Sequence, residues 1–256
     1  MKTETAVMPR IPQDIIDEIL DHLATDSDLG PFRACALVSR SWVQSCQQHL
    51  FRDVGFNSRD VDRWFKVFPV PEESPAHYVR ELRIWIGGGN CVPEKFFKYI
   101  HWFTSVEKLS LYGFGGAPPM RMTSLWRLPQ SVTSLILDTS VVTLLQVKDI
   151  MAQLPNLDNL SLLRTLTPAG EDVLPGVGVT PVGRFGGRLL LCGGCAGKDV
   201  VDTLLEAPSG LRFTEMQIYC MRECVPSVVR LVEACSKTLV KLSHGVASLG
   251  KSHTFS

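Results

Sequence analysis

The sequence predicts an α/β protein: three short helices, then an irregular solenoid of short parallel strands that alternate with helices and loops. Two observations lead to this fold class. Apolar residues recur at helical spacing in the stretch from 11 to 51. Beyond it, one apolar pattern returns about every 27 residues, as in repeat proteins. The predicted divisions are a flexible tail (1–10), the helical segment (11–52) and about 7–8 irregular repeats (53–256) with a loop insert at 167–187.

The composition favours a folded chain of one or two domains without a strongly charged partner. Of the 256 residues, 45% are hydrophobic and 20% are charged, which excludes general disorder. Lys plus Arg and Asp plus Glu number 26 each, so neither nucleic acid nor an anionic membrane is indicated as a partner. We expect no secretory signal and no membrane span, because no apolar run of the required length is seen. Eight cysteines then indicate reduced thiols and a cytoplasmic or nuclear location, or both.

The first stretch reads as three helices. Pro12 suits the first position of a helix, and the apolar stripe Ile15, Ile19 and Leu23 follows at i, i+4 and i+8. A second helix is expected from Gly30 to about residue 38. Ser39 is the expected N-cap of a third helix, which carries Trp42, Val43, Cys46 and Leu50. Such a segment is too small to be stable alone, so it must pack on the rest of the chain or on a partner.

This stretch resembles the F-box. The matching patterns are I-P-x-D-I-I-x-x-I-L-x-x-L, then C-x-L-V-S-R-x-W, then L-F. The resemblance implies docking on a Skp-type adaptor, which connects F-box proteins to a cullin–RING ubiquitin ligase. It also implies the adaptor-binding or supporting residues, namely Ile11, Pro12, Ile15, Ile16, Val38 and Trp42. An ordinary amphipathic three-helix cap on a larger domain is the alternative.

The repeat has the template apolar-x-x-apolar-x-apolar. Its central residues are Val54, Leu82, Leu109, Leu135, Leu160, Leu189, Met216 and Leu242. From 54 to 242 is 188 residues in seven intervals, or about 27 per repeat, within the range of leucine-rich repeats. Alternation makes each copy a strand with one buried face, and neighbouring copies must stack to cover it. Helical returns are expected at 93–103, 144–154, 198–205 and 226–235.

The second half therefore resembles the leucine-rich-repeat class of F-box proteins. It departs from that class because the usual Asn or Cys after each strand is missing, so irregular units are expected. Side chains that flank each central residue should line the open face of the sheet. The predicted target-binding residues on this face are Arg83, Trp85, Lys108, Tyr112, Asp138, Gln217 and Tyr219. A merely solvated sheet face, with the target on loops such as 167–187, is the alternative.

Signs of catalysis or of cofactor binding are weak, and no cofactor is expected. The glycine-rich run before Lys198 resembles a phosphate-binding loop, but Cys192 and Asp199 stand where that motif needs Gly and Ser or Thr. A four-thiolate zinc site is conceivable, although buried structural thiols are commoner; its ligands would be Cys192, Cys195, Cys220 and Cys224. The six histidines are scattered, and none stands beside a plausible nucleophile together with a third, orienting group.

The sequence thus predicts a non-enzymatic protein, the substrate-recognition subunit of a Skp–cullin–F-box ubiquitin ligase. In this hypothesis the helical segment binds the adaptor and the repeats bind a target protein, whose identity the sequence does not reveal. The alternatives are an F-box scaffold that acts without ubiquitylation and an enzyme built on the repeats or on their glycine-rich insert.

Overall fold

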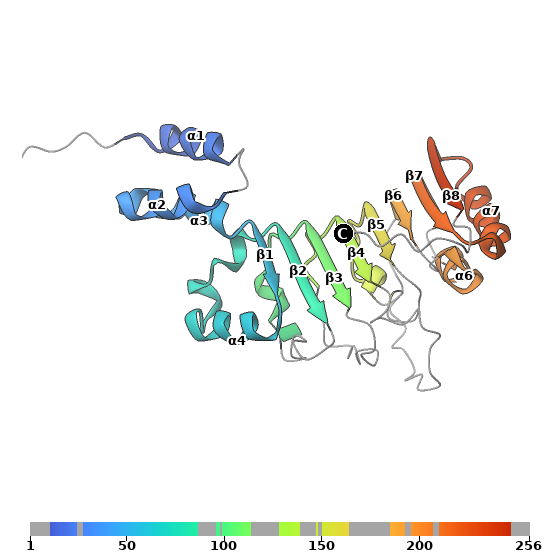
Figure 1. The fold of residues 1–256 in the computed structure, drawn as a ribbon, viewed down its shortest axis with the longest axis horizontal. Helices are drawn as coiled ribbons and strands as arrows, with labels where there is room; N and C mark the ends of the chain where they lie inside the picture. Colours follow the sequence, from blue (N-terminus) through green and yellow to red (C-terminus); the bar gives the residue numbers. More distant parts are fainter. Residues whose placement is uncertain are drawn as a thin grey trace, which may run out of the picture. The chain divides into compact units, whose positions relative to one another are not determined.

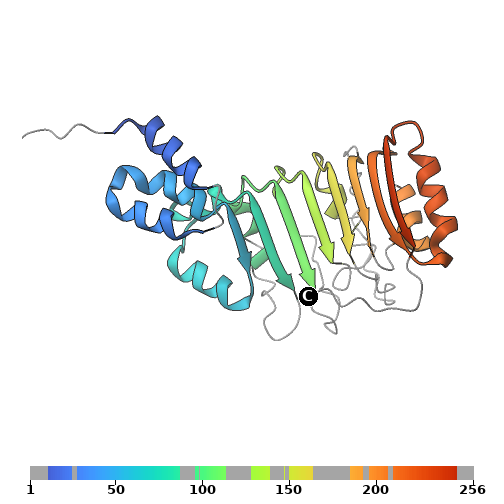
Figure 2. The ribbon, with the colours of Figure 1, turned by 45° about the horizontal axis from the view of Figure 1, so that its top comes forward.

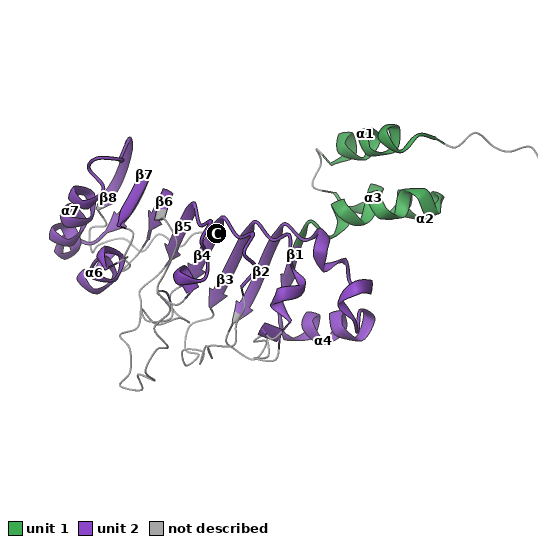
Figure 3. Cartoon of the chain, turned by 180° about the vertical axis from the view of Figure 1, so that it is seen from behind, with its two compact units in different colours: residues 1–53 green, residues 54–256 purple. Residues whose placement is uncertain are grey.

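The computed structural model describes residues 11–24, 28–86, 96–97, 99–113, 128–138, 147, 150–163, 185–192, 196–206 and 210–246. The chain forms two compact units, residues 1–53 (unit 1) and 54–256 (unit 2) (Figure 3). The predicted tail and the predicted insert up to residue 184 lie outside the described residues. The last part of that insert is not a loop, because strand β6 already begins at Phe185.

Unit 1 contains the three helices that the sequence predicts: α1 (Gln13–Leu23), α2 (Gly30–Val38) and α3 (Arg40–Leu50). Pro12 occupies the N-cap position of α1 with an extended ψ of 147°, so the helix begins one residue later than predicted. The Ser39 hydroxyl accepts a hydrogen bond from the Ser41 amide, which confirms the predicted cap of α3. The core of the unit consists of Ile16, Leu20, Phe32 and Cys46.

An eight-stranded parallel sheet dominates unit 2, and its strands lie side by side in chain order (Figure 1). The bounds are β1 (Asp53–Phe56), β2 (Glu81–Ile86), β3 (Lys108–Gly113), β4 (Ser134–Asp138), β5 (Asn159–Leu163), β6 (Phe185–Leu191), β7 (Leu211–Cys220) and β8 (Lys241–Val246). Every pair from β2 to β8 is parallel. Parallel neighbours need a crossover, and each intervening segment returns the chain to the start of the next strand.

The register of the sheet confirms the phase of the sequence repeat from β2 onward. Each central apolar residue is the register partner of the next one, in the order Leu82, Leu109, Leu135, Leu160, Leu189, Met216 and Leu242. From Leu82 to Met216 these side chains are 0–1% exposed. A repeat near 27 residues therefore builds one continuous apolar layer on the inner face of the sheet.

The return segments agree with the sequence in part. Helix α6 (Lys198–Leu205) matches its predicted range, and α7 (Val225–Ala234) lies within one residue of its own. Figure 2 shows α6 and α7 together on one side of the sheet. In the predicted helix at 93–103 the described helical residues are of the 3-10 type, namely 96–97 and the turn η4 (Ile100–Trp102). The predicted apolar cluster is nevertheless buried: Phe96, Phe97, Ile100 and Phe103. Of 144–154, the described helical residues are 147 and 150–152.

Helix α4 (Ser58–Val67) was not expected from the repeat pattern. The local sequence nevertheless contains its signal: the side chain of Asn57 accepts from the amide of Asp60, and the Asp60 carboxylate accepts from the amide of Asn57. The helix is followed by two 3-10 turns, η1 (Pro71–Glu73) and η2 (Pro75–Tyr78). Another 3-10 turn, η6 (Arg222–Cys224), precedes α7.

Aromatic side chains fill the core at the β1 end of unit 2. The Phe56 ring meets Trp64 edge-on at 5.2 Å and lies 5.1 Å from Phe96. Such contacts fix the return helix against the sheet. Among the described residues, no helix combines the length and the apolar character that crossing a bilayer requires.

Candidate protein-docking surfaces

A polar network joins the first and third helices of unit 1. The Gln13 amide donates to Asp17 Oδ1 at 2.9 Å and to Ser45 Oγ at 2.8 Å, and Ser45 Oγ donates to Asp17 Oδ1 at 2.6 Å. The hydrogen bond from the Ser45 hydroxyl, and then that from Gln13, lower the pKa of the Asp17 carboxyl. The network fixes the rotation of α1, since Ser45 is itself buried.

The rotation of α1 leaves one of its apolar flanks uncovered. Ile16 and Leu20 point into the core, whereas Ile15 and Ile19 stay 43% and 40% exposed. Ile15 and Ile19 are four residues apart and therefore lie on the same face of α1, outside the unit's own core. Ile11 precedes the helix and is 52% exposed.

The end of α2 adds two further exposed aliphatic side chains. Leu37 is 88% exposed and Val38 is 72% exposed, just before the cap of α3 at Ser39. We call Ile11, Ile15, Ile19, Leu37 and Val38 the exposed aliphatic residues of unit 1; Leu29, before α2, is also 40% exposed but is not part of this group. Single exposed apolar residues are common, but five of them in a segment of about forty residues mark a candidate protein-docking surface.

The predicted adaptor-binding residues divide into two groups. Ile11, Pro12, Ile15 and Val38 are exposed. Ile16 is 1% exposed and belongs to the core, so it supports this surface from beneath and offers no contact area of its own. Trp42 is half-buried and packs against the same core. The sequence pattern missed Leu37 and Ile19 as surface residues, because apolar spacing alone does not tell which flank of a short helix is covered.

On the outer face of the sheet, two predicted target-binding residues form an aromatic pair. Trp85 and Tyr112 are register partners on β2 and β3, and their rings stack at 5.9 Å with an interplanar angle of 27°. The Trp85 ring also lies over β1, where a Cβ on Gly55 would come within 2.5 Å of it. The missing side chain of Gly55 thus lets the indole lie close to the neighbouring strand.

Charged residues precede this aromatic pair on the same strands. Lys108 Nζ lies 3.0 Å from the carboxylate of Glu81, its register partner. Arg83 is half-buried, and its register partner Ser110 is fully buried. The Ser110 hydroxyl has no hydrogen-bond partner among the described residues. Arg83, Trp85, Lys108 and Tyr112 therefore lie on two adjacent strands, as the sequence predicted.

The other predicted target-binding residues lie elsewhere. Gln217 and Tyr219 are on β7, four strands from β3, where the Gln217 amide donates to the Tyr219 hydroxyl at 2.6 Å. Tyr219 is 46% exposed. Asp138 is 2% exposed, so its prediction as a contact residue does not fit the structure. It lies in the last position of β4, where burial depends on neighbouring segments and not on alternation alone.

Among the described cysteines, Cys192 and Cys220 are not arranged as two ligands of one thiolate metal site. The Cys192 amide still pairs with the Leu162 carbonyl, and alternation after the buried Leu191 directs Cys192 to the face opposite that of Cys220. Burial raises the pKa of both thiols, in Cys220 with a contribution from Cys224. Cys195 lies outside the described residues. Within the described part of the chain, no group of three or more His, Cys, Asp or Glu side chains could hold a metal ion.

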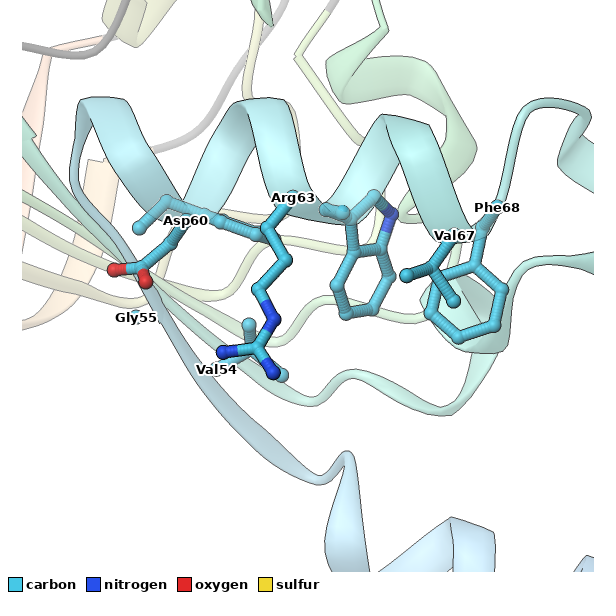
Figure 4. A pocket seen from close by; sticks show the side chains of 8 residues that line it. Val54, Gly55, Asp60, Arg63, Val67 and Phe68 are labelled. Atoms are coloured by element: carbon cyan, nitrogen blue, oxygen red, sulfur yellow. The ribbon is translucent and has the colours of Figure 1, made fainter.

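An open pocket of about 250 Å³ lies between β1 and α4 (Figure 4). Phe56 and Trp64 are among the residues that line it, and Arg63 reaches from α4 toward Val54 on β1. This volume is below the roughly 300–1,000 Å³ of pockets that hold small molecules. The carboxylate of Asp60, which also lines the pocket, caps α4. The pocket is therefore better explained as the uncovered side of a helix–strand contact than as a substrate cavity.

Comparison of the chain with protein-family models, with curated proteins and with solved structures finds no match.

Proposed function

We propose that this chain is the substrate-recognition subunit of a Skp–cullin–F-box ubiquitin ligase. In this proposal, unit 1 is an F-box that binds a Skp-type adaptor. Unit 2 is an irregular leucine-rich-repeat solenoid that binds a target protein. The protein would have no catalytic role of its own, and its location would be cytoplasmic, nuclear or both.

The observation that carries the proposal is the exposed aliphatic residues of unit 1. Their side chains stay 40–88% exposed although the same three helices build a separate core. Burying one such side chain on a partner contributes about 1.5–3 kcal/mol, so several together can sustain a specific complex. They fall on the residues of the F-box-like pattern I-P-x-D-I-I-x-x-I and L-V-S-R.

The repeat unit supports the second half of the proposal. Its inner face is occupied by the apolar layer, whereas its outer face presents the stacked rings of Trp85 and Tyr112. Aromatic side chains with fixed orientation are enriched among residues that dominate protein interfaces. The Glu81–Lys108 pair beside them adds one charge of each sign, so a target need not be strongly charged.

The mechanism would be positioning. A protein that holds an adaptor with one unit and a target with the other raises the effective concentration of the ligase's transferable ubiquitin near the target. Such a mechanism needs two binding surfaces and no reactive group on this chain.

Affinity capture of the full chain tests the adaptor half. Pro12→Ala with Ile15→Ala, and separately Leu37→Asp with Val38→Asp, should abolish capture of a Skp-type adaptor. All four side chains are exposed, so neither pair should unfold the helices. Val67→Asp is the matched control, because Val67 is an exposed aliphatic residue of α4, 58% accessible. Undiminished capture by both double variants, with unchanged circular dichroism, would overturn the assignment.

Capture also separates the alternatives. A target that is ubiquitylated by the reconstituted ligase only with intact unit 1 supports the recognition role. Adaptor binding without ubiquitylation of any captured protein supports a scaffold. Trp85→Ala and Tyr112→Ala should each weaken the binding free energy of a captured target by more than about 1 kcal/mol and leave adaptor binding unchanged.

A further inference from the structure

The central apolar row of unit 2 is covered from β2 to β7, but not at its last strand, β8. The six side chains from Leu82 to Met216 are at most 1% exposed, whereas Leu242 on β8 is 45% exposed. His244 holds the next inward position on β8, as the register partner of the buried Ile218, and is exposed as well. Since β8 is last in the strand order, its outer edge has no partner strand among the described residues.

Helix α7 carries further exposed apolar side chains at the same end of unit 2. On one flank, Arg230 reaches Asp202 of α6 at 2.6 Å, and Leu231 is fully buried toward the sheet. At 100° per residue, Val225 and Val229 lie on the flank away from α6. They are 41% and 48% exposed.

We call Val225, Val229, Val240 and Leu242 the end surface. Val240, immediately before β8, is 86% exposed. Figure 2 shows β8 as the last strand of the sheet, with α7 beside it at the same end of the unit. In stacked repeats each unit covers its neighbour, so an exposed apolar position on a strand edge that has no partner among the described residues favours a capping partner.

We propose that the end surface binds the end surface of a second copy of this chain, which makes a two-fold symmetric dimer. A two-fold axis runs the two β8 edges antiparallel, and an antiparallel pairing satisfies the free amides and carbonyls of both strands. The same axis sets the two α7 helices antiparallel on one side of the joined sheet. The valine flanks then face each other over the two Leu242 side chains.

The charges around α7 favour this self-pairing. Glu223 lies just before the helix and Lys237 just after it, and both are exposed. In an antiparallel arrangement, Glu223 of one copy faces the helix end that carries Lys237 of the other. Opposite charges therefore meet twice, whereas a parallel arrangement would place like charges together.

Light scattering of the full chain during size-exclusion chromatography, over a hundredfold range of concentration, tests the dimer. The mass should rise toward about twice the 28.4 kDa of one chain. Val229→Glu and Leu242→Glu should each raise the dissociation constant by at least about tenfold, since a charge would be buried. Val67→Glu on α4, which is 58% exposed and lies near the other end of the sheet, should leave the dissociation constant unchanged.

Charge exchange tests the arrangement. Glu223→Lys alone and Lys237→Glu alone should each weaken the dimer. An equimolar mixture of the two variants should restore it, because the mixed dimer regains both opposite-charge contacts. A single-chain mass at every concentration would refute the proposal. So would a wild-type dimer that Val229→Glu and Leu242→Glu leave intact, because another surface or another capping segment would then be responsible.

Discussion

Replacing Gly187 with Ala should destabilise unit 2 strongly, although the side chain gained is a single methyl group. Gly187 has a φ of +74° and lies where the pairing of β6 with β7 shifts register. A Cβ there would lie 2.0 Å from the carbonyl oxygen of Asp158 on the neighbouring chain segment. That carbonyl accepts the Arg188 amide at 2.8 Å, so the methyl group would displace a link between β5 and β6.

The expected loss in the free energy of unfolding is the sum of two contributions. A left-handed φ in a residue with a Cβ costs about 1–2 kcal/mol. Losing the hydrogen bond from Arg188 to Asp158 costs about 1 kcal/mol more. The free energy of unfolding should therefore fall by about 2–3 kcal/mol, which lowers the urea midpoint by about 1 M at a typical slope.

Two other glycines separate these terms. Gly210 has a φ of +69° and open space around the position of a Cβ, so Gly210→Ala should cost the backbone term of about 1–2 kcal/mol alone. Beside Gly187, a Cβ on Gly186 would meet its nearest atom at an ordinary 3.6 Å, so Gly186→Ala should stay within about 0.5 kcal/mol of wild type. Urea unfolding followed by circular dichroism measures all three. A Gly187→Ala midpoint equal to that of Gly186→Ala would refute the reasoning.

Further predictions concern unit 1 and the cysteines. Phe32→Ala removes a side chain that is 2% exposed and should cost about 3–5 kcal/mol, seen as faster amide hydrogen exchange across residues 13–50, whereas Leu37→Ala should leave exchange unchanged. Asp17 has a lowered pKa in the fold, so its carboxylate stabilises unit 1 above the ordinary value of 3.8 and this contribution is lost as the pH falls. The stability difference between wild type and Ser45→Ala should accordingly be largest near neutral pH and shrink in acid; a difference independent of pH would contradict the network. Purified protein should contain no stoichiometric zinc, and a chelator should leave its melting temperature unchanged.

Much of the β-structure could be predicted because its cause is local and periodic. Side chains alternate along a strand, so the apolar spacing already indicates that Leu109 and Leu160 point into the core and that their direct neighbours point to the opposite face. The return helix at Lys198–Leu205 is equally local, since its apolar residues repeat at helical spacing. Local signals in the first stretch, namely Pro12, the apolar spacing and the Ser39 cap, likewise predicted the three helices of unit 1.

The exposure of individual side chains needed the tertiary structure. Ile15 and Ile16 are equally apolar and adjacent in sequence, and only the packing of α1 on α3 decides that Ile16 is core and Ile15 is surface. By alternation Asp138 lies on the same face of the sheet as the half-buried Lys108, yet Asp138 is buried. At the end of a strand, alternation alone does not determine whether a side chain is covered.

Leu242 gives the reverse case. The sequence by itself determined that it occupies the same phase as Met216 and Leu189, because phase depends only on spacing along the chain. That it stays 45% exposed was decided by its place in the sheet, on a strand with a described neighbour on one side only. Burial depends on which other residues pack against a side chain in the folded protein, and the spacing of residues along the sequence does not contain that information.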